Sequence, residues 1–171
     1  MAKQPKTLDE LFHDTLKDIY FAEKKILVAL PKMTKAAQNE DLAAAFAKHE
    51  GETEAQIERL EEVFALIEKK PQGKNCPAII GLVEEGQEII KEYKGSPALD
   101  AGLLAAAQSV EHYEISRYGT LRTWAEELGL DEAVELLQAT LAEEEATDKA
   151  LTELAEAVIN QQAEGEDEAA A

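Results

Sequence analysis

The sequence predicts an all-α protein of four long helices, with a shorter helix in the connection between the second and the third. Its 171 residues are rich in Ala, Leu, Glu and Lys and contain only five prolines, a composition typical of helices. Apolar residues recur at alternating spacings of three and four along four stretches, as on the buried face of a helix. We expect one domain over residues 1–162, followed by a small acidic tail, 163–171, that is disordered.

The first helix is expected to begin at a capping box formed by Thr7 and Glu10. It should extend to about residue 38, with a kink caused by Pro31. Its core-facing positions, which we call the seam, are Leu8, Phe12, Leu16, Ile19, Glu23, Ile26, Leu30 and Met33. Glu23 is the one charged residue in this apolar stripe.

The second helix should start after an Asn39 cap and return antiparallel to the first. Helix-breaking residues at 69–73 are expected to end it. Its seam is Leu42, Ala45, His49, Glu52, Gln56, Leu60, Val63 and Ile67. The long connection that follows, residues 71–99, contains an amphipathic pattern that predicts a crossover helix over about 76–93.

The third helix is predicted from Pro97 to about Leu128, and Gly129 suits the left-handed position after its end. Its seam is Leu104, Ala107, Glu111, Glu114, Tyr118, Leu121, Ala125 and Leu128. Asp131 is the expected cap of the fourth helix. The seam of that helix is Leu137, Leu141, Glu144, Asp148, Leu151, Ala155 and Val158.

Each of the four seams therefore carries acidic residues near its middle. A charge taken out of water costs several kcal/mol unless an opposite charge meets it. In a four-helix arrangement these acids and one histidine would converge, and two divalent ions would balance them. Oxygen ligands with one imidazole favour iron, or else manganese. The predicted ligands are Glu23, His49, Glu52, Glu111, Glu114, Glu144 and Asp148; no catalytic residue is assigned.

Other interpretations of these residues remain open at this point. Any single acid can belong to a solvated helix face, and His49 alone can be an ordinary core histidine. His112 is expected outside the ligand set or on the surface, Tyr118 as a core residue able to donate a hydrogen bond to a ligand, and Glu145 as a ligand if the fourth helix is rotated. Two other classes of function fit the pattern: a non-catalytic structural protein with a degenerate or single-metal site, and a helical adaptor that binds partners through acidic outer faces.

The formal net charge of −19 excludes nucleic acids and anionic membranes as favoured partners and suits a protein that handles cations. The one cysteine, Cys76, cannot form an intramolecular disulfide. The sequence shows neither the apolar run of a signal peptide nor a membrane-spanning stretch. We therefore expect a cytoplasmic protein.

Five motifs of the sequence are informative when they are taken together. They are Leu16-x-Asp-x-Tyr-x-Ala-Glu23, His49-x-x-Glu-Thr-x-x-Gln56, Gly81-Leu-x-Glu-Glu-Gly86, Val110-Glu-His-Tyr-Glu-Ile115 and Leu141-x-Glu-Glu-x-x-x-Asp148. This combination resembles the YciE/YciF-like stress-protein branch of the ferritin-like superfamily. The resemblance covers nearly the whole chain. It implies a ferritin-like antiparallel four-helix bundle with a long crossover between helices two and three. It also implies iron-handling chemistry and homodimers. Our leading hypothesis for the predicted metal site is a reaction with O2 or peroxide, of an oxidase or peroxidase type.

The chain departs from the usual superfamily pattern at two places. The histidine of the second helix precedes its glutamate, and the fourth helix has Glu144 and Asp148 where a glutamate and a histidine are usual. These departures weaken the carry-over of a ferroxidase rate and of iron storage in a protein cage.

Overall fold

The computed structural model describes residues 5–165, and within them all regular structure is helical. The elements are α1 (Leu8–Ala36), α2 (Glu40–Leu66), α3 (Pro77–Glu92), α4 (Leu99–Glu127), α5 (Asp131–Leu154), the π-helical turn η1 (Ala155–Ile159) and α6 (Asn160–Ala163). The predicted all-α fold and the crossover helix are confirmed. No helix in this part of the chain is long and apolar enough to cross a membrane.

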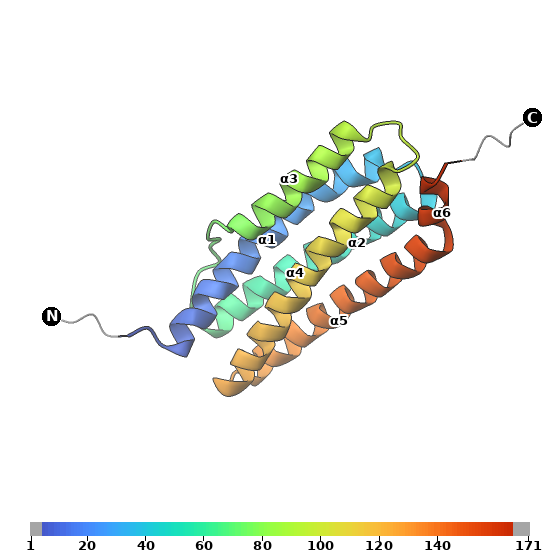
Figure 1. The fold of residues 1–171 in the computed structure, drawn as a ribbon. Coiled ribbons are helices and arrows are strands. Elements are labelled where there is room, and N and C mark those ends of the chain that lie inside the picture. The colour runs from blue at the N-terminus through green and yellow to red at the C-terminus, as the bar shows by residue number, and fades with distance from the viewer. Residues whose placement is uncertain (1–4, 166–171) are drawn as a thin grey trace, which may run out of the picture.

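Helices α1, α2, α4 and α5 form a four-helix bundle, and α3 lies outside it against α1 and α4 (Figure 1). Around the bundle the neighbours are α1 with α2, α2 with α5, α5 with α4, and α4 with α1. Each neighbouring pair is antiparallel, whereas α2 and α4 run in the same direction (Figure 1). The chain must therefore travel the length of the bundle between α2 and α4, and α3 provides that crossover.

Three helix ends follow the local chemistry of the sequence. Thr7 Oγ1 accepts a hydrogen bond from the Glu10 N–H at 3.3 Å, and the Glu10 carboxylate accepts from the Thr7 N–H at 2.9 Å, which completes the capping box. The Asn39 side chain accepts from two N–H groups at the start of α2. Gly129 has φ 70°, the left-handed conformation expected of it.

Other helix ends differ from the sequence prediction. α4 begins at Leu99 rather than Pro97, after a turn in which Ser96 Oγ accepts a hydrogen bond from the Ala98 N–H at 3.2 Å. Asp131 is not the cap of α5; it is the first residue of that helix, and Leu130 precedes it without a capping side chain. Of the predicted tail, residues 166–171 lie outside the described part of the chain.

The end of α2 also differs, because the helix stops at Leu66, before the breaker residues. Glu68 adopts φ 56°, and the Lys69 N–H donates to the Phe64 carbonyl at 2.9 Å. This turn closes the helix in the way a left-handed glycine usually does. A glutamate in that conformation carries no recognisable signal in the sequence.

The core consists of apolar layers on either side of a polar centre. One end is filled by buried side chains that include Phe12, Leu16, Phe64, Leu121 and Leu137. The other end is filled by Leu30, Leu42, Leu103 and Leu151, among others. The middle of the bundle instead contains Glu23, His49, Gln56, Glu111, Glu114 and Glu144, each at most 4% exposed. Water is thus kept from both ends of a strongly acidic interior.

Candidate metal centre

Four buried residues from three helices meet at the centre of the bundle. His49 on α2, Glu111 and Glu114 on α4, and Glu144 on α5 each place one potential ligand atom within 4.8 Å of the others. His49 Nε2 lies 3.3 Å from Glu111 Oε1 and 3.8 Å from Glu144 Oε2. The structure thus brings together four of the seven residues predicted as ligands.

Glu23 brings a fifth carboxylate from the remaining bundle helix, α1. It is completely buried, and the Tyr118 hydroxyl donates a hydrogen bond to its Oε1. Tyr118 therefore has the role considered for it from the sequence, that of a hydrogen-bond donor to a candidate ligand.

Glu52 and Asp148 lie at the edge of the group. Glu52 Oε2 is 3.6 Å from His49 Nδ1, while its other oxygen pairs with Lys48. Asp148 Oδ1 accepts from Gln108 at 3.2 Å and lies 3.1 Å from the Nε2 of His112. Both acids are half-buried, with side chains 24% and 23% exposed. Their predicted role as metal ligands stays a prediction.

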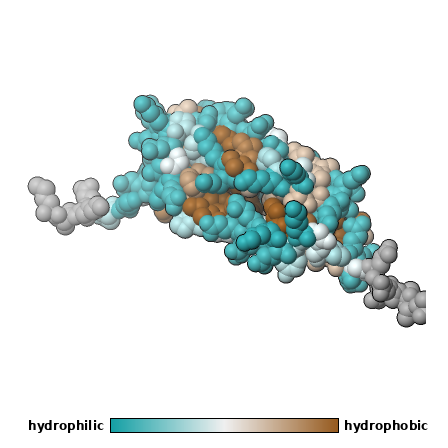
Figure 2. Space-filling model, turned by 90° about the horizontal axis from the view of Figure 1, so that it is seen from above, coloured by the Kyte–Doolittle hydropathy of each residue, from teal (hydrophilic) through white to brown (hydrophobic). Residues whose placement is uncertain are grey.

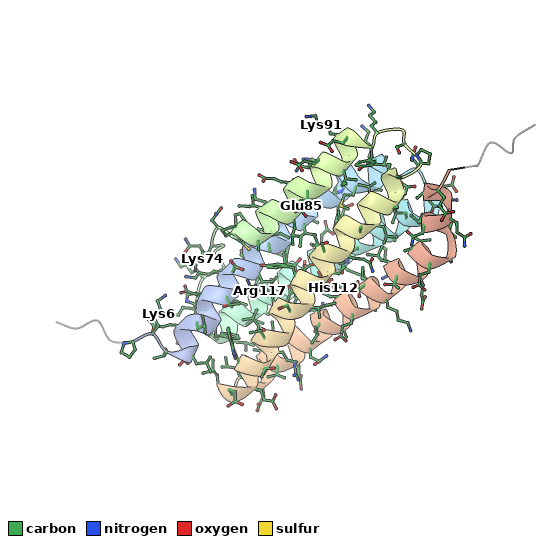
Figure 3. The ribbon with its side chains drawn as sticks, in the orientation of Figure 1. Lys6, Lys74, Glu85, Lys91, His112 and Arg117 are labelled. Carbon is green, nitrogen blue, oxygen red and sulfur yellow. The ribbon has the colours of Figure 1, made fainter. Side chains whose placement is uncertain are left out.

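The orientation of α2 explains the position of Glu52. This helix buries Thr53 in place of Glu52, so the carboxylate turns toward the bundle edge. His112 lies on α4 where this helix is next to α5 (Figure 3), and its side chain is 70% exposed, as expected for a residue outside the ligand set. Glu145 is exposed, so α5 is not rotated in the way that would make it a ligand.

The central group contains many buried polar atoms without a hydrogen-bond partner. Within the described residues these include both ring nitrogens of His49, both carboxylate oxygens of Glu114, and one oxygen each of Glu23, Glu111 and Glu144. Leaving one such atom unpaired costs about 1–3 kcal/mol. Unpaired atoms of this kind require an explanation, and carboxylate oxygens with one imidazole nitrogen are a donor set that suits iron or manganese. The residues present therefore fit the expected metal.

The electrostatics of the group point in the same direction. Burial, followed by repulsion from Glu144, raises the pKa of Glu23 to about 8 and that of Glu111 to about 11. Burial also raises the pKa of Glu144, and burial with repulsion from Glu23 raises that of Glu114 well above its usual range. Without a cation, the carboxyl groups of Glu23 and Glu111 would therefore hold protons at neutral pH. Two divalent ions carry four positive charges, the number that these four carboxylates balance.

Further side chains hold Glu144 in position. The Gln56 amide donates to Glu144 and, at 3.2 Å, to the adjacent Glu143. Arg59 donates to both oxygens of Glu143 at 2.7 and 2.6 Å. Residues that orient a metal ligand commonly affect metal affinity as well. We did not predict this role from the sequence, although the seam position of Gln56, one turn beyond the predicted ligand Glu52, could have indicated it.

Comparison with known proteins identifies relatives along nearly the whole chain. Residues 7–164 match a family described as a domain of unknown function, DUF892. Protein YciF of Escherichia coli K12 is 46% identical over 160 residues, which cover 93% of this chain and 96% of YciF.

Solved structures agree with this relationship. The crystal structure of the E. coli stress protein YciF has a TM-score of 0.87 at 46% identity and covers 92% of this chain and 99% of YciF. YcfI of Rhodopseudomonas palustris has a TM-score of 0.83 at 47% identity, covering 89% of this chain and 97% of YcfI. A Xanthomonas campestris protein, 19% identical over 92% of this chain and 96% of its own, has a TM-score of 0.72 and shows the shared fold alone. The chain therefore belongs to the DUF892 family and is a homologue of YciF.

Proposed function

We propose that this protein binds two iron ions, with manganese as the alternative metal, at the centre of its bundle and uses them to react with O2 or peroxide. The observation that supports this most strongly is the set of buried, unpartnered carboxylate and imidazole atoms on four bundle helices. An empty site of this composition costs the fold stability. Two bound metal ions would pair with the buried carboxylates, so metal binding would stabilise the folded protein.

The ligands fall into an inner and an outer group. His49, Glu111, Glu114 and Glu144 would hold the metal directly, because their ligand atoms already converge. Glu23, from α1, and Glu52, beside His49, would complete the coordination of a second ion. Asp148 would contribute only through a rearrangement away from Gln108.

Two divalent iron ions held at this site would supply two electrons and become trivalent, and these electrons with two protons would reduce O2 to hydrogen peroxide. The chain's own residues prepare the site for this reaction. The carboxyl groups, whose pKa values are raised, must release protons when metal binds, so binding should strengthen as pH rises. The Tyr118 hydroxyl keeps the Glu23 carboxylate oriented. The apolar layers above and below exclude water.

A second candidate is a non-catalytic structural protein that binds a single ion or none. One observation favours it: the four atoms within 4.8 Å of one another suffice for one ion, and Glu52 is paired with Lys48. The two candidates differ in metal content and in reactivity toward oxygen.

The biological setting is also a proposal. Because the homologue YciF is described as a stress protein, we propose a stress-response role for this chain in the cytoplasm, as a homodimer. We do not propose nucleic acids as partners, because a chain with a net charge of −19 repels their phosphate groups.

The direct test is the metal content of protein purified without added metal or affinity tag, measured by plasma mass spectrometry. We expect close to two iron or manganese ions per chain, and their loss in the Glu111→Gln/Glu114→Gln double variant. The matched control is Glu126→Gln/Glu127→Gln, which removes two exposed acids from the same helix and corrects for cations attracted by the surface charge. Equal metal content in the two double variants would contradict the proposal.

A further inference from the structure

A small cavity leads from the surface beside α3 to the edge of the metal centre. About 40 Å³ of it is open to the centres of water-sized molecules. At its outer end lie the exposed residues Lys32 on α1 and Gln87 on α3. At its inner end lie the buried His49 and Glu111. The cavity therefore connects the outside of the molecule with two of the candidate ligands.

The wall of this cavity is almost entirely apolar between its two ends. The side chains that line it include Leu30 and Phe46 from the buried core, Val83 from α3, and Ala106 and Ala107 from α4. Seen from above, the molecule also exposes apolar patches among its hydrophilic side chains (Figure 2). Such a wall offers a polar or charged molecule few hydrogen-bond partners along the way.

The crossover helix α3 forms one side of the passage. Gly86 is buried in the middle of α3, and a Cβ atom there would lie 3.8 Å from the Cβ of Ala106. Small residues thus face each other where α3 lies against α4. A larger side chain at this contact would occupy the cavity, so the passage depends on small residues in both helices.

We infer that this cavity binds dioxygen and delivers it to the His49–Glu111 edge of the metal centre. This inference rests on the proposed function. Of the two oxidants proposed there for the metal centre, O2 and peroxide, it selects O2. A cavity needs about 10–15 Å³ of such space to hold one water molecule, and apolar cavities take up apolar gases. The cavity space of about 40 Å³ therefore accommodates a diatomic gas. Hydrogen peroxide and metal ions would lose hydration along the apolar wall and must reach the centre by another path.

Xenon binding tests the cavity independently of any bound metal. Crystals of metal-free protein under xenon pressure should show xenon between α3 and α4 in the wild type. Xenon should be absent in Ala106→Leu, which fills the space, and present in the control Ala101→Leu, a half-buried alanine of the same helix that does not line the cavity. Absence of xenon from the wild-type cavity would overturn the inference while leaving metal binding untouched.

Kinetics of the iron-loaded protein test the delivery of O2. In stopped-flow mixing, Ala106→Leu should slow oxidation by O2 several-fold and leave oxidation by hydrogen peroxide unchanged, whereas Val83→Ala, which enlarges the cavity, should not slow either reaction. Equal slowing of both oxidants in Ala106→Leu would contradict the proposed selectivity. If the protein binds no iron at all, the proposed function fails, and the xenon experiment alone then decides whether the cavity takes up an apolar gas.

Discussion

At the scale of single residues, Tyr118 shows how a neutral side chain prepares an acidic centre. It is fully buried on α4, and its hydroxyl donates a hydrogen bond to Glu23 on the neighbouring helix α1. Burial and the negative charge of Glu23 raise the pKa of Tyr118 well above its usual range. The phenol therefore remains a donor throughout the physiological pH range.

Replacement of Tyr118 by Phe removes the hydrogen-bond donor of Glu23. Since the second oxygen of Glu23 already has no partner, we expect the metal-free variant to lose about 1–3 kcal/mol of unfolding free energy. Urea denaturation at pH 7 measures the difference. Tyr93→Phe, at a residue that is 42% exposed, is the control and should have wild-type stability. Equal stability of Tyr118→Phe and wild type would show that this hydrogen bond contributes nothing.

The candidate ligands could be predicted from the sequence to different degrees. Glu111 and Glu114 stand in a regular apolar stripe, so their burial follows from periodicity alone. Glu52 and Thr53 are neighbours, and which of them is buried depends on a small rotation of α2 that packing decides. The Gln56 contact with Glu144 joins residues 88 positions apart. A contact of that kind follows from how the helices pack, which periodicity does not specify.

At the scale of elements, Asp100 connects three helices. It is 5% exposed, and its two oxygens accept hydrogen bonds from the N–H groups of Gln38 at 2.9 Å and Asn39 at 2.7 Å. The first turn of α4 is thereby attached to the turn between α1 and α2. This contact holds together the end of the bundle at which α4 begins, after the crossover helix α3.

Replacement of Asp100 by Ala should destabilise the protein by about 2–3 kcal/mol, because hydrogen bonds to charged groups are among the stronger ones. The control is Asp131→Ala, an exposed acid in the first turn of α5, which should change stability by less than about 0.5 kcal/mol. Urea denaturation of both variants measures the difference. A similar small effect for both would mean that Asp100 does not attach α4 to the turn.

Helix ends were predictable where one residue type carries the signal. The Thr7 box, the Asn39 cap and the Gly129 turn all depend on side chains with a specific chemical role. At Glu68 and Leu130, by contrast, the helix ends are formed by residues that are neither typical capping residues nor glycine. Their conformations are held by the surrounding structure, and this is why sequence rules placed those ends incorrectly.

At the scale of the whole molecule, the fold was predictable because four long periodic stretches allow few arrangements. The one long connection carried an amphipathic helix, and a crossover between parallel helices needs such a segment. The bundle thereby provides a buried centre for its acidic side chains. The same feature makes the stability of the metal-free protein depend on pH.

The metal-free protein should become less stable as pH rises. The pKa of Glu23 is raised from 4.5 to about 8 in the folded state, so between these values the native state binds more protons than the unfolded state. Unfolding free energy then falls with increasing pH, by several kcal/mol for shifts of this size. Urea denaturation at pH 5 and pH 8, at constant ionic strength with a chelator, measures the change.

The Glu111→Gln/Glu114→Gln variant separates two contributions to the pH dependence of stability: titration of the buried acids and repulsion between surface charges. The amides of this variant do not titrate. Its stability should vary less between pH 5 and pH 8 than that of the wild type, whereas Glu126→Gln/Glu127→Gln should behave as the wild type does. A metal-free wild type that is more stable at pH 8 than at pH 5 would contradict this assignment of the buried charge.

The most direct test of the proposed dinuclear centre is a crystal structure of iron-loaded protein with anomalous diffraction measured at the iron edge. We predict two anomalous peaks in the bundle centre, about 3.5–4 Å apart, with His49, Glu111, Glu114 and Glu144 among the ligands and Glu23 beside the second ion. A single peak would support the single-metal structural protein. No peak in the centre, with iron only on the acidic surface, would contradict the proposed function.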